Sequence, residues 1–241
     1  MIRVFDKYAN KIKKLNGFEK EDILIPEFNL YRDDKISIYY APHNEIINKQ
    51  AKIFIIGITP GWTQTSIAYK TAYEGLNKNW DYETIKYECK RNSRFAGSMR
   101  KNIIEMLDEL DIPKYLNISS TLELFDNDDF LHTTSVIPYP VFINSKNYTG
   151  SNPRITENRV LYDYVKKYFY SEVQSVSHAL FIPLGKAVEE VLELMIKENI
   201  IAKEQCLLGF PHPSGANGHR KSQFEANKVE LQSKVRNFFG N

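Results

Sequence analysis

Two loops rich in glycine and proline carry the residue types that could do chemistry. The first, GITPG at residues 57–61, places one hydroxyl between two glycines. The second, HPSG at residues 212–215, places an imidazole close to a hydroxyl and is followed by Asn217, His219 and Arg220. Glycine lets a backbone approach a ligand closely, and imidazole and hydroxyl groups can donate hydrogen bonds to a reacting oxygen. These loops are the first candidates for a binding or catalytic site.

Buried strands must position the two loops. Residues 53–57 form an apolar run that ends in the first loop, and a helix follows, an order typical of the active edge of an α/β protein. Further strands are predicted at residues 130–137, 179–184 and 206–210. The intervals are too long for hairpins, so the strands should be parallel and joined by right-handed crossovers. The predicted fold is α/β, a three-layer αβα sandwich with a central, mainly parallel four-stranded sheet.

Helical patterns occupy most of the intervals. Residues 94–112 show apolar positions at helical spacing, and Pro113 is expected to stop this helix. A later helix is expected to be capped by Thr156 and to run through Tyr168. Residues 65–73 continue the first loop as a helix or a lid. The other predicted helices cover residues 4–15, 82–91, 187–199 and 221–239. Residues 36–40 alternate like a short strand.

Length and composition favour a single domain over residues 1–241, with residues 1–50 as an N-terminal extension packed on it. The chain has 241 residues, 42% of them hydrophobic, and no low-complexity linker divides it. No apolar run approaches the ~20 residues of a membrane span, and the charged start is unlike a signal peptide. Cys89 and Cys206 are too few and too far apart for a zinc site or a disulfide framework. We therefore expect a cytoplasmic monomer without a metal.

Charge is unevenly placed, although the formal net charge is only +2. Residues 86–101 contain six basic residues against Glu88, a local net charge of +5, and residues 105–129 contain eight acidic residues against Lys114. The basic residues are Lys86, Lys90, Arg91, Arg94, Arg100 and Lys101. A face that binds phosphates is one interpretation of this run, and an ordinary solvated helix face is the other.

Neither loop alone identifies a function. GITPG lacks the GKS or GKT of a phosphate-binding loop and the spaced glycines of a dinucleotide site, so no nucleotide cofactor is expected. HPSG is not the GxSxG turn of a hydrolase, so Ser214 is a poor nucleophile. Considered singly, each loop would more often be a structural turn.

Considered in order, five stretches resemble the uracil-DNA glycosylase superfamily, over about residues 51–225. GITPG is similar to the family's first motif, GINPG or GEAPG, and HPSG to its second, HPSP or NPSG. The stretch beginning RFAGSMRKNIIEMLDELDI at Arg94 resembles PFVGRAGKLLDELL of the thermostable branch, and TTSVIPYP at residues 133–140 resembles its TNVVKCRPP. IPLGKAVEEVL at residues 182–192 matches the third strand and helix of that branch.

The resemblance implies a monofunctional DNA glycosylase. Such an enzyme flips a damaged or modified base out of DNA and hydrolyses its N-glycosidic bond, leaving an abasic site, in base-excision repair or in defence against phages with modified DNA. His212 matches the histidine that donates to the departing base, Phe95 the ring that stacks on it, and Thr59 the residue that holds water. Threonine cannot act as a base near neutral pH, so another group is needed if water is to be activated by a base. Candidates for that group are Tyr69, Glu74 and His132.

The expected site residues form three groups, and the expected partner is DNA. The catalytic residues are Thr59 and His212. The base-binding residues are Gly57, Ile58, Pro60, Gly61, Phe95, Thr133 and Thr134. The DNA-binding residues are Arg91, Arg94, Arg100, Ser214, Gly215, Asn217, His219, Arg220 and Lys221. No cofactor is expected, because two cysteines cannot supply the four ligands of the iron-sulfur cluster of the thermostable branch.

Two departures from the family pattern concern the base. Gly61 stands where the most uracil-strict branch carries a blocking tyrosine, which leaves room for a 5-substituent. Either Thr134 or Thr133 stands where the family reads uracil with an asparagine, and one hydroxyl cannot reproduce an amide's two contacts. A base larger than uracil is therefore expected. The alternatives are a catalytically weak DNA-binding or damage-sensing module of the same fold and an unrelated α/β hydrolase or nucleotide-processing enzyme.

Overall fold

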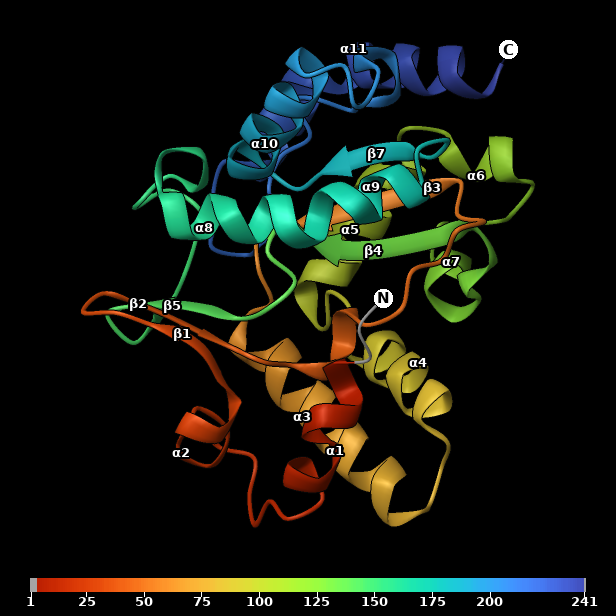
Figure 1. The fold of residues 1–241 in the computed structure, drawn as a ribbon. Coiled ribbons are helices and arrows are strands. Elements are labelled where there is room, and N and C mark those ends of the chain that lie inside the picture. Colours follow the sequence, from red (N-terminus) through yellow and green to blue (C-terminus); the bar gives the residue numbers. More distant parts are fainter. Residues whose placement is uncertain (1–3, 241) are drawn as a thin grey trace. The chain divides into compact units, whose positions relative to one another are not determined.

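The computed structural model describes residues 4–240, which fall into two compact units made of interleaved segments (Figure 1). The first unit contains the N-terminal segment through Ile47, Thr59–Ala96 and Ile137–Thr149. The second contains Asn48–Ile58, Gly97–Val136 and the chain from Gly150 onward. The single domain with an N-terminal extension stays a prediction. Within residues 4–240, no helix combines the length and the apolar character that crossing a membrane requires.

A parallel sheet lies at the centre of the second unit. Strand β3 (Ile53–Gly57) lies between β4 (Leu131–Ser135) and β7 (Leu180–Pro183), and Ile55 pairs with Thr133 across β3 and β4. Every residue of the three strands is buried, as expected for parallel strands covered on both faces. The α/β class is confirmed, and three of the predicted strands are present in parallel arrangement.

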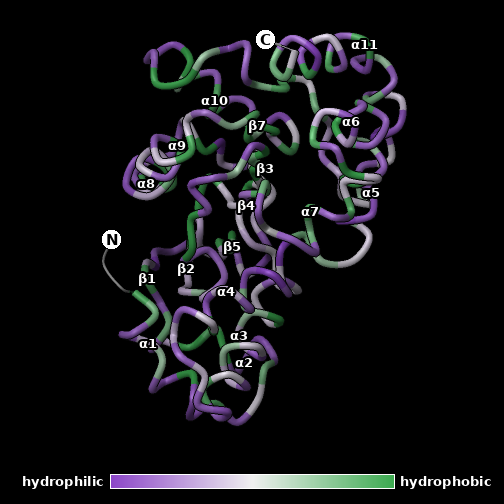
Figure 2. Tube along the Cα trace, turned by 90° about the vertical axis from the view of Figure 1, so that its right-hand side faces the viewer, coloured by the Kyte–Doolittle hydropathy of each residue, from purple (hydrophilic) through white to green (hydrophobic). Residues whose placement is uncertain are grey.

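Helices cover both faces of this sheet, as Figures 1 and 2 show from two directions. Helices α8 (Arg159–Tyr164) and α9 (Tyr170–Ser175) lie on one face, and α5 (Ser98–Asp108) and α6 (Ile112–Leu116) lie on the other. Helix α10 (Lys186–Lys197) contacts β7. The other helical elements of the unit are α7 (Glu123–Asp126), the π-helical segment Val165–Phe169, α11 (Arg220–Phe239) and the 3-10 turns Asp128–Phe130, Ile155–Glu157 and Lys203–Gln205.

The predicted fourth parallel strand at residues 206–210 is wrong. Cys206 forms one isolated parallel bridge with Phe181, and the N–H of Leu207 donates to the carbonyl of Phe181 at 2.9 Å. The chain then turns at Gly209, which has φ +91°, a conformation that glycine adopts without strain. This turn takes the backbone out of the ladder, so the parallel sheet has three strands.

The first unit contains a second sheet, which is antiparallel and mostly unforeseen. Its strand order is β1-β2-β5-β6, and β2 pairs with β5 through Ile38 and Val141. Only β2 was predicted as a strand from the sequence. The strands are β1 (Asn29–Arg32), β2 (Ile36–Tyr39), β5 (Val141–Ile143) and β6 (Lys146–Asn147). The helical elements are α1 (Val4–Ile12), α2 (Lys20–Ile23), α3 (Trp62–Asn77), α4 (Tyr82–Ser93) and the 3-10 turns Pro26–Phe28 and Pro42–Asn44.

Two residues that were expected to bound helices have other roles. Pro113 does not stop α5, which ends earlier at Asp108, but lies in the first turn of α6, where its missing N–H has no cost. Asn158, not Thr156, caps α8, because its side chain accepts from the backbone N–H three residues later at 3.1 Å. Thr156 belongs to the preceding 3-10 turn.

A buried carboxylate makes the stability of the first unit depend on pH. Glu45 accepts from the N–H of Phe5, in the first turn of α1, at 3.2 Å, and burial raises the pKa of Glu45 from 4.5 to about 7. The folded chain then holds a proton that the unfolded chain releases between these values. The stability due to this group is therefore complete below about pH 4.5 and is lost as the pH rises to 7.

We expect Glu45→Gln to raise the free energy of unfolding at pH 8 by about 1–3 kcal/mol, with little change at pH 4. The neutral amide removes the cost of ionising a buried group. Urea unfolding at both pH values measures the difference. Glu21→Gln, at an exposed position of the same unit, is the matched control. An unaltered pH dependence in Glu45→Gln would contradict the prediction.

Candidate functional site

The carboxyl ends of the parallel strands carry several expected base-binding residues. Gly57 ends β3 and Ile58 follows it, while Thr133 and Thr134 lie near the end of β4. The N–H of Val136 donates to the carbonyl of Gly57 at 2.9 Å, so the two chains stay paired up to this edge. Within the second unit, the structure therefore brings together the residues expected from β3 and β4.

The HPSG loop lies against the end of β7. A Cβ atom added to Gly185, which follows β7, would lie 2.8 Å from the Cβ atom of His212. The N–H of Gly185 donates to the carbonyl of Phe210 at 3.2 Å, and Asn102 of α5 donates to the carbonyl of Pro213 at 2.8 Å. The loop is thus held from the sheet and from α5.

His212 is set up as a neutral hydrogen-bond donor. Burial lowers the pKa of His212 below its ordinary value of 6.5, which keeps the imidazole neutral at physiological pH. The N–H of Ser214 donates to its Nδ1 atom at 3.2 Å. Because Nδ1 accepts, the hydrogen of the neutral ring is on Nε2. A neutral imidazole held in this way can donate from Nε2 to an oxygen that gains negative charge.

Two of the expected DNA-binding side chains brace this loop from within. Asn217 donates to the carbonyl of His212 at 3.1 Å, and Arg220 donates to the carbonyl of Ser214 at 3.3 Å. His219 and Lys221 are exposed, as is Gly215 at the tip of the loop. The exposed residues are the ones available to a partner.

The basic run of residues 86–101 does not form one exposed face. Lys86, Lys90 and Arg94 are buried. Lys86 forms an ion pair with Glu83 at 2.5 Å, and Lys90 donates to the carbonyl of Ile46 at 2.7 Å. A buried cation is not placed to contact a phosphate, so the interpretation as one phosphate-binding face loses its support.

The other two arginines of that expected group lie in different units. Arg91 is exposed on α4 in the first unit, 3.7 Å from Glu88, and Arg100 in the second unit lies over the ring of Phe125 at 5.4 Å. DNA-binding roles for Arg91, Arg94 and Arg100 stay predictions.

The hydroxyl of Thr59 already has two partners in the first unit. Its Oγ1 atom donates to the carbonyl of Tyr139 at 2.7 Å and accepts from the N–H of Val141 at 3.1 Å. A hydroxyl has one hydrogen and two acceptor positions, so Thr59 can still accept from a water but has no hydrogen left to donate. Its catalytic role stays a prediction.

Gly61 caps α3 with open space beside it. Its N–H donates to the side chain of Gln64 at 3.2 Å, and an added Cβ atom would meet no atom within 4 Å. Its φ of −78° is ordinary for any residue. Pro60 beside it is buried. The backbone at Gly61 therefore accepts a side chain, and the room for a 5-substituent stays a prediction.

Phe95 has an unusual backbone for an aromatic residue. It is buried, with φ +46°, and Gly97 follows with φ +78° just before α5. A bulky residue in the left-handed region costs of order 1 kcal/mol or more, and such strain concentrates at functional sites. The conformation is compatible with the expected stacking role, which stays a prediction.

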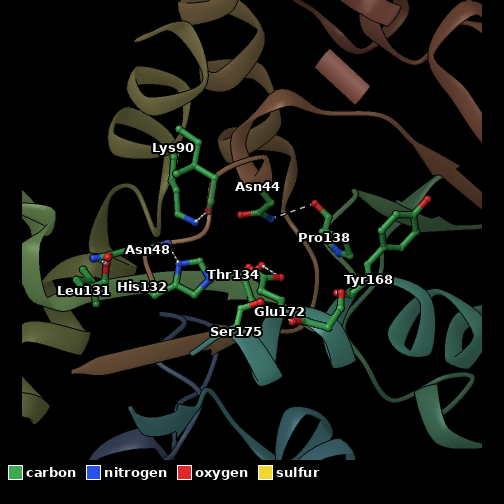
Figure 3. Close-up of polar contacts among 12 residues, drawn as sticks. Asn44, Asn48, Lys90, Leu131, His132, Thr134, Pro138, Tyr168, Glu172 and Ser175 are labelled. Carbon is green, nitrogen blue, oxygen red and sulfur yellow. Dashed lines mark hydrogen bonds and ion pairs between the residues drawn. The ribbon is translucent and has the colours of Figure 1, made fainter. Parts of the chain in front are cut away.

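The sequence reasoning missed a buried carboxylate, Glu172 on α9 (Figure 3). Its Oε1 atom lies 2.7 Å from Nε2 of His132, and its Oε2 atom accepts from the hydroxyl of Thr134 at 3.2 Å. The N–H of Asn48 donates to Nδ1 of His132 at 3.4 Å, so Nε2 carries the hydrogen and donates to Glu172. His132 and Thr134 precede Glu172 by 40 and 38 residues in the sequence, and no local motif links them to it.

A π-helical segment precedes this carboxylate. Residues Val165–Phe169 connect α8 to α9 as a π-helical segment, in which the hydrogen bonds span five residues instead of four. Such segments change which side of the helix the following residues face, and they are frequent at functional sites. Glu172 comes three residues after the segment and contacts β4 through its carboxylate.

The three further candidates for activating water have different surroundings. Tyr69 is buried in the first unit, and its hydroxyl donates to the carbonyl of Tyr40 at 2.8 Å. Glu74 is exposed on α3. His132 is buried and donates to Glu172. Among these three, His132 is the one on the parallel sheet.

Comparisons with known proteins place the chain in a family. No family model matches it. Its sequence is 45% identical over 235 residues to the uncharacterized protein YoxB of Bacillus subtilis strain 168, covering 96% of this chain and 92% of YoxB. Its fold is similar to the crystal structure of wild-type Pedobacter heparinus SMUG2, with a TM-score of 0.50 and 13% identity over the whole of both chains. Because the sequence identity with YoxB is high and spans nearly the full length of both proteins, the chain belongs to the family of Bacillus subtilis YoxB.

Proposed function

We propose that the protein is a monofunctional DNA glycosylase, which flips a damaged or modified base out of DNA and hydrolyses its N-glycosidic bond. The observation that carries the proposal is the state of His212, a neutral imidazole with its Nε2 hydrogen available at the carboxyl edge of a parallel sheet. The five matching stretches and the likeness of fold to SMUG2 support the uracil-DNA glycosylase superfamily.

The chemistry follows from where charge develops. The bond between C1′ and the base nitrogen breaks, and its electron pair leaves with the base. The oxygen of water bonds to C1′, and a proton of that water is released. Negative charge grows on a carbonyl oxygen of the base, and a fixed donor such as Nε2 of His212 lowers the barrier there. The ring of Phe95 would offset part of the flipping cost of ~ a few kcal/mol, since base stacking contributes ~1–3 kcal/mol.

A second candidate is a DNA-binding or damage-sensing module of the same fold. Thr59 favours it, because its hydroxyl hydrogen is directed at the carbonyl of Tyr139 and no carboxylate stands at that position. Such a protein would bind a flipped base and turn it over slowly or not at all.

Abasic-site formation on a panel of oligonucleotides separates the two candidates. The panel contains uracil, hypoxanthine and pyrimidines with 5-methyl and 5-hydroxymethyl groups, and abasic sites are detected by alkaline strand cleavage under single-turnover conditions. Turnover of at least one base supports the glycosylase. Retention of modified DNA without turnover supports the module. Neither binding nor turnover on any oligonucleotide would contradict both.

We expect Gly61→Tyr to reduce excision of 5-substituted bases relative to uracil by ~10-fold or more, which corresponds to ~1.4 kcal/mol in the transition state. The ring would fill the room that a 5-substituent uses. The ordinary φ of Gly61 and the absence of atoms within 4 Å of an added Cβ atom indicate that the backbone there accepts a side chain. The measurement is the ratio of single-turnover rates on 5-hydroxymethyluracil and uracil. Gly61→Ala is the matched control, and an unchanged ratio in Gly61→Tyr would contradict the assignment.

A further inference from the structure

We propose that Glu172 reads the base, and that the site takes a base with an exocyclic amine, as in cytosine, in preference to an oxo base such as uracil. The inference rests on the proposed function and names the substrate class of the same site. It depends on the contacts of Glu172 with His132 and Thr134, all within the second unit.

Thr134, one of the two threonines that could stand where the resembling family carries an asparagine, presents an acceptor. Its hydroxyl hydrogen is directed at Oε2 of Glu172 at 3.2 Å. The remaining hydrogen-bonding capacity of this hydroxyl is its oxygen lone pairs. An asparagine would instead present both a donor and an acceptor. Threonine in place of asparagine therefore removes the donor from this position and leaves only acceptors.

Glu172 provides further hydrogen-bond acceptors beside Thr134. Oε1 of Glu172 accepts from His132 and Oε2 accepts from Thr134, and each oxygen has a further acceptor position. The side chain of Glu172 retains 7% exposure, so it is not fully sealed. The positions that remain on Glu172 and Thr134 are all acceptors.

The network fixes this arrangement before any ligand binds. Asn48 donates to Nδ1 of His132, which commits the Nε2 hydrogen to Glu172. Thr134 donates to the other oxygen. Glu172 thus receives one hydrogen bond on each oxygen and keeps its orientation against β4. Figure 3 shows His132, Thr134 and Glu172 converging from the strand and the helix.

A set of acceptors selects a base edge that donates. The 4-amino group of cytosine donates, and pairing of Glu or Asp with this amine is a recurrent contact in DNA recognition. The 4-oxo group of uracil or thymine is an acceptor and would leave buried acceptors unpaired, at a cost of ~1–3 kcal/mol. The expected discrimination is therefore about 10-fold to 100-fold in favour of the amine.

The test uses pairs of bases that differ only at position 4. 5-Hydroxymethylcytosine is compared with 5-hydroxymethyluracil, and 5-methylcytosine with thymine, each placed in duplex DNA opposite a stable abasic analogue so that neither base is paired. Binding is measured with non-cleavable 2′-fluoro nucleotides, which removes the different leaving abilities of the bases, and excision with the ordinary nucleotides. We expect the full-length wild-type protein to bind the amino member of each pair at least 10-fold more tightly.

Glu172→Gln tests the residue itself. The amide keeps an oxygen that can accept from His132 and adds a donor for a 4-oxo group, so the ratio of amino to oxo binding and excision should fall by 10-fold or more. Glu157→Gln is the matched control, since Glu157 is exposed in the same unit and pairs with Arg154. It should leave both ratios unchanged.

Each outcome decides between the inference and the function on which it rests. If wild type prefers the oxo members and Glu172→Gln does not alter the ratio, the inference is overturned and the glycosylase stands. If no base in any oligonucleotide is excised, the proposed function fails and the inference fails with it. If Glu172→Gln does not unfold cooperatively, the wild-type binding ratio alone decides.

Discussion

Replacing His212 by alanine should lower the single-turnover rate of base excision by ~10² or more, the usual effect of removing one preorganised donor from a developing oxyanion. DNA affinity should change little, because the donor acts mainly in the transition state. The Nε2 hydrogen of His212 is free to donate, whereas Nδ1 is occupied by the N–H of Ser214. The measurement is abasic-site formation with enzyme in excess over the preferred oligonucleotide.

His178→Ala is the matched control for this experiment, since His178 is an exposed histidine of the same unit. Urea unfolding of both variants distinguishes a chemical role from a structural one. A normal excision rate in folded His212→Ala would mean that the HPSG loop is only a turn. A variant that loses stability but keeps its rate per folded molecule would assign His212 to the loop's architecture.

Gly185→Ala should destabilise the second unit by about 2–4 kcal/mol, and it should also slow excision. The backbone of Gly185 has φ +87° and ψ 173°, a region that is essentially limited to glycine. The added methyl group would also lie 2.8 Å from the Cβ atom and 3.4 Å from the Cα atom of His212. Relief of this contact requires movement of the HPSG loop, and strain and overpacking each cost ~1–3 kcal/mol.

Urea unfolding gives the stability change, and Gly218→Ala is the matched control. Gly218 lies in the same loop, has no positive φ, and would place its added Cβ atom more than 4 Å from any neighbour. It should unfold at the wild-type urea concentration. If Gly185→Ala also unfolded there, the close packing of the loop on the end of β7 would be contradicted.

The strands that the sequence revealed are those with long apolar runs. Residues 53–57, 130–137 and 179–184 were each predicted as strands, and β3, β4 and β7 occupy them. The short strands β1, β5 and β6 were missed, because two to four residues carry too little pattern and β5 pairs with a strand about a hundred residues earlier. Residues 206–210 have the apolar pattern of a strand, but the turn at Gly209 ends the pairing after one bridge.

In the candidate site, too, residues within a short motif could be predicted, and residues that depend on distant contacts could not. His212 and Gly61 were found because each lies in a short motif. Glu172 was not found, because its two partners come from β4 and its approach depends on a π-helical segment that the apolar pattern does not reveal. Counting charges also cannot show burial: Lys86 and Lys90 are buried in the first unit, where Lys86 pairs with a carboxylate and Lys90 donates to a carbonyl.

The interleaving of the two units constrains how the chain can be synthesised and dissected. The chain passes from one unit to the other five times, after residues 47, 58, 96, 136 and 149. On the ribosome, the first unit stays incomplete until residue 149 has emerged, and the second until α11 has been made. Both units depend on closing long loops before their contacts stabilise them, a cost that slows folding. No single cut releases either unit intact, so fragments ending at any of these crossings should be substrates for cellular proteases.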